Sequence, residues 1–299
     1  MQNAAMAMVA GIKDGVRFIR LLHNARAAFD LKKQPMALHY RADREKSIPV
    51  NAPNSAHARL LARIHRRYRT VTELIALADR SYSFTRIADP NRVLDEVAAD
   101  EQRLQKLNGA KKEDYLHLPY WAELWDSALG MGQLVLGIMG EPAMGVSPKD
   151  MGGTPMIRRV LDLGCGMRFA GMVAASVGDR VVFADIEPPA LLFARLNSLH
   201  YSPAARTRQL NWQTTRLNEQ FDLILGADIL YERKQWDYLE PFWREHLAAG
   251  GSVLLGEPGR QTGDNFPAWI APRGWTIAYH EQKVVTRNRP IRLFQLRRV

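Results

Sequence analysis

Apolar and polar residues follow two rhythms along the second half of the chain. Short continuous apolar runs, rich in Val, Ile and Leu, predict buried strands, whereas longer segments with apolar residues three or four positions apart predict helices. Strand and helix succeed one another in turn, which predicts a parallel sheet with helices on both faces. The predicted strands are residues 159–163, 180–185, 206–210, 221–227 and 251–257, and the predicted helices are residues 167–177, 188–200 and 234–248.

The C-terminal part of the pattern predicts a different pairing. After a predicted helix at 264–272, two apolar runs at 275–279 and 291–296 are joined by a charged connection, and their spacing predicts an antiparallel pair at the sheet edge. The fold class is therefore α/β, with a seven-stranded and mostly parallel sheet. In an open sheet of this kind a ligand binds beyond the carboxyl ends of the strands, here of the first, second and fourth.

The first part of the chain has another character. Apolar residues at three-to-four spacing in 6–30 and 56–80 predict helices, separated by the Pro-containing stretch 47–55. A turn-like segment at 108–112 then precedes a tryptophan-rich region. The expected domains are a basic, mainly helical N-terminal extension, residues 1–112, and an α/β domain, residues 113–299.

Charge is concentrated upstream. Residues 1–112 contain 21 Lys and Arg against 11 Asp and Glu, and the remainder contains 20 of each, so the net charge of +10 lies in the first part. Such a part attracts nucleic acid or an acidic protein surface. It can equally be a solvated helix face, with arginine stems covering apolar neighbours. Both interpretations stay open for the densest cluster, which consists of Arg63, Arg66, Arg67 and Arg69.

Composition limits the setting of the protein. With 299 residues and 46% hydrophobic content, the chain can bury a full α/β core plus an appendage. Its one cysteine, Cys165, excludes an internal disulfide and an all-cysteine zinc site, and its apolar runs are too short to span a bilayer. The first residues lack the leading basic region of a secretory signal. We expect a cytoplasmic protein without a metal site, since the eight histidines are scattered.

The most specific pattern joins a glycine turn to an acidic residue. The apolar run that starts at Val160 ends in Gly164, Cys165 and Gly166, and Asp185 closes the next apolar run. A βαβ unit holds an adenosine-containing cofactor in this way. The glycines let the backbone approach the ligand, and the carboxylate accepts hydrogen bonds from two ribose hydroxyls.

The same turn discriminates between cofactors. A dinucleotide fingerprint has a third glycine where this chain has Phe169, and a bulky side chain there obstructs the passage of a pyrophosphate. S-adenosylmethionine carries no phosphate and tolerates a looser turn. Its sulfonium favours nearby aromatic faces, for which Trp121, Trp125 and Tyr231 are candidates. We therefore expect S-adenosylmethionine as the cofactor.

Five segments carry a family resemblance through their order along the chain: Leu118–Trp125, Val160–Gly166, Asn211–Trp212, Ala227–Tyr231 and Glu257–Arg260. With them the chain resembles the seven-strand, class I S-adenosylmethionine-dependent methyltransferases. It looks like the protein-lysine methyltransferases grouped with the enzyme that acts on the beta subunit of electron transfer flavoprotein. The resemblance runs from about residue 113 to the C-terminus and implies a Rossmann-like sheet that transfers a methyl group to a protein lysine nitrogen.

The resemblance implies a set of cofactor-binding residues. Gly164 and Gly166 pass under the methionine part, Asp185 holds the ribose and Trp212 packs on the adenine. The full set is Trp121, Asp162, Gly164, Gly166, Asp185, Trp212 and Ala227. Structural alternatives stay open for the two tryptophans: Trp121 can be a core residue on one helix face with Trp125, and Trp212 can be edge packing.

The resemblance also implies an acceptor site. Asp228 orients the amine by accepting its N–H groups and Tyr231 walls the channel, while Trp125, Glu257 and Arg260 contribute to substrate binding. A lysine amine must first lose its proton, which costs roughly 4 to 5 kcal/mol at pH 7. The alternative for Asp228 and Tyr231 is a helix N-cap with a packing tyrosine.

One departure from the family affects the glycine turn. The family has a third glycine where this chain has Arg168. Its side chain either turns outward, or neutralises the cofactor carboxylate, or crowds the pocket. We therefore keep two alternatives to the transfer to a protein lysine: methylation of a small amine, and a weakly active methyltransferase-like domain whose basic extension binds nucleic acid or protein. Nucleic acid is possible but not favoured as a partner.

Overall fold

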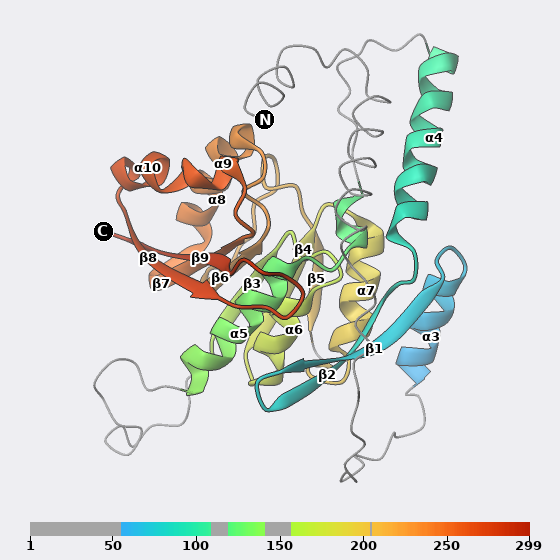
Figure 1. Ribbon diagram of the computed structural model, residues 1–299, viewed down its shortest axis with the longest axis horizontal. Coiled ribbons are helices and arrows are strands. Elements are labelled where there is room, and N and C mark those ends of the chain that lie inside the picture. Colours follow the sequence, from blue (N-terminus) through green and yellow to red (C-terminus); the bar gives the residue numbers. More distant parts are fainter. Residues whose placement is uncertain (1–54, 109–118, 141–156, 204) are drawn as a thin grey trace. The chain divides into compact units, whose positions relative to one another are not determined.

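The computed structural model describes residues 55–108, 119–140, 157–203 and 205–299 (Figure 1). The chain divides into two compact units, one of Met1–Asn51 and Ala98–His117, the other of Ala52–Val97 and Leu118–Val299. The second unit contains the whole sheet and every residue discussed below. The predicted helix at 6–30 and most of the predicted domain boundary lie outside the described residues.

The second unit is built on a seven-stranded sheet with the order β5-β4-β3-β6-β7-β9-β8. The pairs from β5 to β7 are parallel, and β9 is antiparallel to both of its neighbours, so the predicted seven strands and the antiparallel pair at the C-terminal edge are confirmed. The strands are β3 (Arg159–Leu163), β4 (Arg180–Asp185), β5 (Arg206–Gln209), β6 (Phe221–Ala227), β7 (Leu247–Glu257), β8 (Trp275–Gln282) and β9 (Ile291–Arg298).

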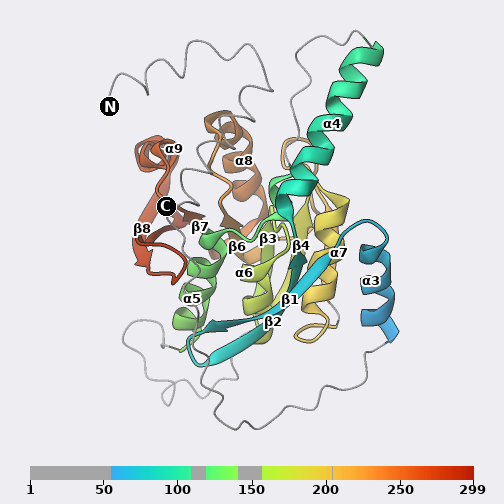
Figure 2. The same cartoon turned by 45° about the vertical axis from the view of Figure 1, so that its right-hand side comes forward.

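Helices cover both faces of the sheet (Figures 1 and 2). Alternate residues of β3 enter two hydrophobic clusters, with Val160 in the first and Leu161 and Leu163 in the second. The first cluster also holds α5 (Asp126–Gly140), α6 (Phe169–Ser176) and α7 (Pro188–Ser198). The second holds α8 (Trp236–His246) and α10 (Phe266–Ile270). The shorter elements are η1 (Tyr120–Ala122), η2 (Arg233–Gln235), α9 (Gln261–Asp264) and η3 (Ala271–Arg273).

The prediction of a helix at 56–80 is wrong beyond its first part. The helix α3 (Ser55–His65) ends early, and a hairpin of β1 (Thr70–Leu77) and β2 (Arg80–Ile87) follows, before α4 (Pro90–Asn108). Leu74 imitated helical spacing, but its side chain is 68% exposed. The inward set of β1 has period two and ends at Leu77.

The hairpin packs on the helices that cover the first face. Phe84 meets Phe169 edge-on, with ring centroids 5.7 Å apart. Asn197 of α7 accepts the Thr85 N–H (2.8 Å) and donates to the Thr85 carbonyl (2.9 Å) and to the Met167 carbonyl (3.2 Å). One buried amide therefore ties the hairpin to the loop that follows β3. Of the helices in the described ranges, none has the length and apolar content to cross a membrane.

Candidate active site

The predicted site residues meet at one edge of the sheet. Gly164 directly follows β3, Asp185 ends β4, Asp228 directly follows β6 and Glu257 ends β7. These strands are parallel neighbours in the sheet, so their carboxyl ends lie side by side. The sequence motifs are thereby brought together in the place where open α/β sheets bind ligands.

The glycine turn has the backbone that its sequence predicts. Gly164 and Gly166 have φ values of +64° and +51°, which favour glycine. The Cys165 N–H donates to the Ala184 carbonyl at 3.0 Å, which anchors the turn to β4. A Cβ atom on Gly164 would lie 2.9 Å from Ile229 and 3.6 Å from the Trp212 ring. The turn, Trp212 and the segment after β6 therefore border one another, as the cofactor assignment requires.

Asp185 is held by backbone donors. The residue is 8% exposed. Its Oδ2 accepts the Gly166 N–H at 2.8 Å, and its Oδ1 accepts the Glu187 N–H at 2.9 Å. Burial raises the pKa of Asp185 to about 6, while these N–H donors oppose the shift. A carboxylate has about four acceptor positions, so these backbone donors do not exhaust its capacity to accept from a ribose hydroxyl.

Asp162 supports α6. Its Oδ2 accepts the Gly171 N–H at 3.0 Å, and a Cβ atom on Gly171 would collide with Asp162 and lie 2.5 Å from the Phe183 ring. Gly171 therefore lets the helix approach the sheet closely. Burial raises the pKa of Asp162 to about 7, against the effect of the neighbouring Arg168 guanidinium.

Arg168 turns inward. It is 2% exposed, has a φ of +77° and lies over the Phe183 ring. Its three guanidinium nitrogens have no hydrogen-bond partner among the described residues. Burial lowers the pKa of Arg168 well below its usual value. The predicted alternative of an outward side chain is therefore wrong, and the guanidinium instead shares the interior with Asp162.

The two tryptophans of the aromatic segment do not share a helix. Trp121 lies in the single turn η1, whereas Trp125 follows that turn and donates its indole N–H to the Tyr120 carbonyl at 2.9 Å. The interpretation of one helix face is therefore wrong. Trp121 is buried, and its backbone lies within 3.6 Å of a Cβ position on Gly166. It belongs to the core and also borders the glycine turn.

Trp212 and Ala227 lie on either side of the turn. Trp212 is half-buried, and its indole N–H donates to Gln235 at 3.0 Å, which fixes the ring beside Gly164. Ala227 ends β6 opposite Gly256 of β7. Ala227 is half-buried and packs against the first hydrophobic cluster.

Asp228 forms an ion pair that the sequence did not predict. Its backbone is left-handed (φ +60°), its N–H donates to the Gly256 carbonyl at 2.8 Å, and both carboxylate oxygens bind the Arg260 guanidinium. Burial raises the pKa of Asp228 to about 6, while Arg260 opposes the shift. The N-cap alternative is wrong, because the next helical turn begins only at Arg233.

Glu257 holds the turn that presents Arg260. Its buried carboxylate accepts the backbone N–H groups of Gly259 (2.8 Å) and Arg260, and pairs with Arg292 of β9 (Nε to Oε2, 2.8 Å). The cation that Glu257 contacts here is thus Arg292. A direct role in substrate binding stays a prediction.

Three aromatic side chains surround the Asp228–Arg260 pair. Tyr120 meets Tyr231 and Trp125 edge-on, with centroids 5.5 and 6.2 Å apart, and the Arg260 guanidinium lies 5.5 Å from the centre of the Trp125 ring. Tyr231 is 41% exposed, so this aromatic rim, formed by Tyr120, Trp125 and Tyr231, reaches the surface. Tyr120 was missed, although it stands inside the aromatic segment of the sequence. Within the described ranges, no group of three or more His, Cys, Asp or Glu is placed to hold a metal ion.

Comparison with known proteins agrees with this geometry. Residues 122–266 match the family described as lysine methyltransferase. The chain resembles the protein-lysine methyltransferases. It is 38% identical over 106 residues to protein N-lysine methyltransferase METTL21A of Danio rerio, covering 33% of this chain and 48% of that protein.

A second relative matches the subgroup named by the sequence motifs. The electron transfer flavoprotein beta subunit lysine methyltransferase of Danio rerio is 30% identical over 148 residues, 48% of this chain and 51% of that protein. The chain thus spans about half the length of these curated relatives. Among solved structures, magnesium protoporphyrin IX methyltransferase (ChlM) from Synechocystis PCC 6803 covers 71% of this chain and 98% of its own, with a TM-score of 0.45 and 16% identity.

Proposed function

We propose that this protein transfers a methyl group from S-adenosylmethionine to a lysine side chain of an acceptor protein. The observation that carries the proposal is the meeting of the glycine turn and Asp185 with Asp228 and Tyr231 at one sheet edge, inside a segment that matches the lysine methyltransferases. We also propose a cytoplasmic location and a methyltransferase domain that begins near residue 113.

The residues present fit this cofactor. Gly164 and Gly166 offer bare backbone, Asp185 keeps acceptor positions for the ribose, and the Trp212 ring borders Gly164. Arg168, whose guanidinium lacks partners among the described residues, does not remove these features. When bound, S-adenosylmethionine supplies an electrophilic methyl group on a positively charged sulfur.

Asp228 and the aromatic rim have the chemistry to bind a cationic side chain. Asp228 is a buried carboxylate at the base of the aromatic rim, and it already binds the planar cation of Arg260. A lysine ammonium is a cation of similar charge, and aromatic faces also attract cations. We propose that the lysine enters between Tyr120, Trp125 and Tyr231 and takes the place of Arg260 on Asp228.

Asp228 then orients the nitrogen. With a pKa of about 6, it is largely ionised at pH 7 and accepts N–H groups of the amine at its Oδ atoms. The ammonium loses to solvent the proton that does not face Asp228, so the lone pair is left directed away from the carboxylate. Placement of the nucleophile therefore contributes more to the rate than acid–base chemistry does.

The decisive experiment supplies a methyl-labelled donor and a protein lysate to the purified protein, followed by hydrolysis and amino-acid analysis. We expect the label in methylated lysine. Label in a dialysable amine would move the activity to small molecules, and label in nucleic acid would overturn the acceptor class. Absence of transfer together with absence of S-adenosylhomocysteine binding by calorimetry would favour the weakly active alternative.

A further inference from the structure

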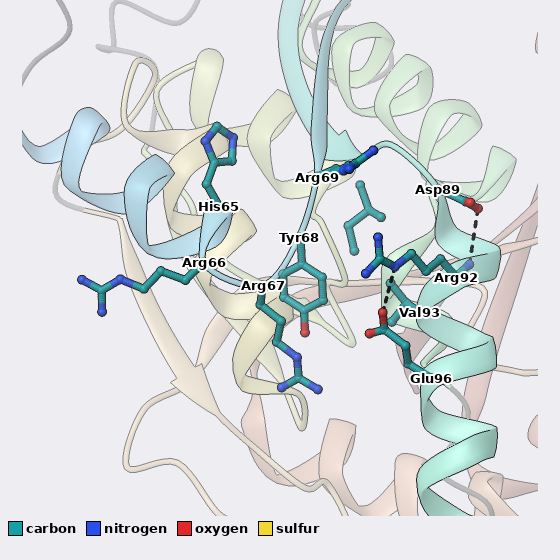
Figure 3. Close-up of a pocket in the computed structure, with 10 residues that line it drawn as sticks. His65, Arg66, Arg67, Tyr68, Arg69, Asp89, Arg92, Val93 and Glu96 are labelled. Carbon is teal, nitrogen blue, oxygen red and sulfur yellow. Dashed lines mark hydrogen bonds and ion pairs between the residues drawn. The ribbon is translucent and has the colours of Figure 1, made fainter.

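A basic cavity lies on the helix–hairpin part of the second unit, apart from the site just described. It has a volume of about 240 Å³ and is formed where α3 leads into β1 and where α4 begins (Figure 3). Four arginines, one histidine and two acids line it, together with the apolar side chains of Ile87 and Val93 and the ring of Tyr68. The arginines are Arg66, Arg67, Arg69 and Arg92.

The acids of this cavity are already engaged. Asp89 accepts the backbone N–H groups of Asn91 (3.1 Å) and Arg92 (3.3 Å) at the start of α4, and Glu96 pairs with the Arg92 guanidinium at 2.9 Å. Among the residues described, neither Arg67 nor Arg69 forms an ion pair with a carboxylate. Both arginines are exposed. The cavity therefore carries positive charge that no carboxylate of the described residues neutralises.

The cavity adjoins the candidate active site through one aromatic contact. The Tyr68 ring, which forms part of its wall, meets the Trp121 ring edge-on with centroids 5.6 Å apart, and Trp121 in turn borders Gly166. Arg67 lies over Tyr68, with its guanidinium 5.5 Å from the ring centre. Tyr68 thus connects the wall of the cavity to the tryptophan that flanks the glycine turn.

We propose that this cavity binds an acidic segment of the acceptor protein and so selects which lysine reaches Asp228. The inference rests on the proposed function and adds the chemistry of the substrate, a lysine accompanied by Asp or Glu side chains. Guanidinium groups bind carboxylates in bidentate fashion, so Arg67 and Arg69 are the specificity-determining pair. Attraction over the scale of the Debye length also speeds the encounter with such an acceptor.

The distribution of charged residues around the cavity favours a protein ligand over a nucleic acid. A polyphosphate backbone needs a continuous basic track with a phosphate contact every few ångströms. Here Asp89 and Glu96 stand on the α4 side of the cavity and interrupt the track (Figure 3). Of the arginines that line the cavity, Arg66, Arg67 and Arg69 form no ion pair with a described carboxylate. All three lie in the short connection around Tyr68, which suits a few carboxylates rather than an extended strand.

The test measures binding without catalysis. Dye-labelled hexaglutamate, hexaglutamine and a single-stranded RNA hexamer are titrated with the full chain by fluorescence anisotropy, at low and high salt. The variant is Arg67→Gln/Arg69→Gln, and the matched control Arg59→Gln/Arg80→Gln removes the same charge from two exposed arginines that do not line the cavity. Thermal unfolding checks that both variants are folded.

We expect hexaglutamate to bind and hexaglutamine not to bind. The cavity variant should bind hexaglutamate about tenfold more weakly, whereas the control stays within about twofold of the wild type. Equal losses in both variants would reduce the effect to net charge and overturn the proposal, as would binding of RNA with no binding of hexaglutamate. This binding test needs no cofactor, so it is independent of methyl transfer. If the protein binds hexaglutamate as expected but transfers no methyl group, the proposed function fails and the proposed binding site for an acidic segment stands.

Discussion

The two ends of the candidate active site hold their central carboxylates by different means. Asp185 at the end of β4 is bound by backbone N–H groups from Gly166 and Glu187, whereas Asp228 after β6 is bound by the side chain of Arg260. Both are buried, and burial raises the pKa of each to about 6. The difference lies in whether the partner can leave.

A backbone donor is fixed by the fold, but a guanidinium on a turn can move away. The Arg260 side chain is 35% exposed and that of Asp228 is 6% exposed. The cofactor end is therefore preorganised for one ligand, while the acceptor end holds a cation that another cation can replace. We infer that affinity for the cofactor and handling of the acceptor are separable, and the following variants test that separation.

The largest effect is expected from Asp185→Asn. The amide presents an N–H₂ group where the carboxylate accepted two N–H bonds and retained acceptor positions for a ribose. Loss of one acceptor oxygen and of the negative charge should weaken S-adenosylhomocysteine binding by about a hundredfold or more in calorimetry. If affinity stayed within a few-fold while the unfolding temperature was unchanged, Asp185 would have no part in cofactor binding.

Asp228→Asn should reduce methyl transfer and leave cofactor affinity nearly unchanged. We expect methyl transfer to fall about a hundredfold, because the amine loses its anionic acceptor, while S-adenosylhomocysteine affinity stays within about twofold. Transfer is measured with labelled donor and affinity by calorimetry on the same preparation. Parallel losses in both measurements would show that the two ends of the site act as one and would remove the distinction between them.

Arg260→Gln tests the side-chain partner of Asp228 through the pH dependence of methyl transfer. Arg260 lowers the pKa of Asp228 and so opposes the effect of burial. Its removal should raise the apparent pKa of the acid limb of the transfer rate from about 6 by about one unit. At pH 7 we expect a loss of about twofold, recovered at pH 8.5, and at pH 5 a loss of about tenfold. Arg260→Lys, which keeps a cation beside Asp228, is the control and should retain the wild-type limb. An unchanged limb in the glutamine variant would assign the titration to another group.

The centre of the sheet was predictable from sequence because β3, β4 and β6 are buried along nearly their whole length. Continuous apolar runs such as 180–185 leave no ambiguity of register or type. The hairpin was not predictable in the same way. Residues 70–77 bury one face only, and the exposed Leu74 added an apolar position that imitates helical spacing. Only contact with α7, through Asn197 and Thr85, decides in favour of the strand.

The site was predictable where the chain order fixes the geometry. Gly164, Asp185 and Asp228 follow parallel neighbouring strands, so their meeting needs no further information. The Asp228–Arg260 pair requires the conformation of the turn after β7. Glu257 at the end of β7 sets this conformation together with Arg292 of β9. Likewise the inward course of Arg168 depends on the space beneath α6, which sequence spacing does not report.

The smallest predicted effect concerns the pH dependence of stability. It again depends on whether a buried carboxyl group is held by backbone N–H groups or by a cation. The pKa values of Asp162, Asp185 and Asp228 are raised by burial to about 7, 6 and 6, above the ordinary 3.8. These three groups therefore bind more protons in the folded than in the unfolded chain between about pH 4 and 7, so their contribution to stability falls as the pH rises through this range. The pKa of Asp222 is lowered by its hydrogen bond to Arg159, so it matters only below about pH 4.

Asp162→Asn isolates one part of that slope. The amide oxygen can still accept the Gly171 N–H, but the titration near pH 7 is gone, so the decline in unfolding temperature between pH 5 and 8 should shrink by roughly 3 °C. The variant is also less stable overall, because Arg168 loses its neighbouring carboxylate in a fully buried position. The slope and the offset are read from the same melting curves. An offset without a change in slope would mean that Asp162 remains ionised beside Arg168 across this range, so that the cation and not the backbone N–H decides its charge.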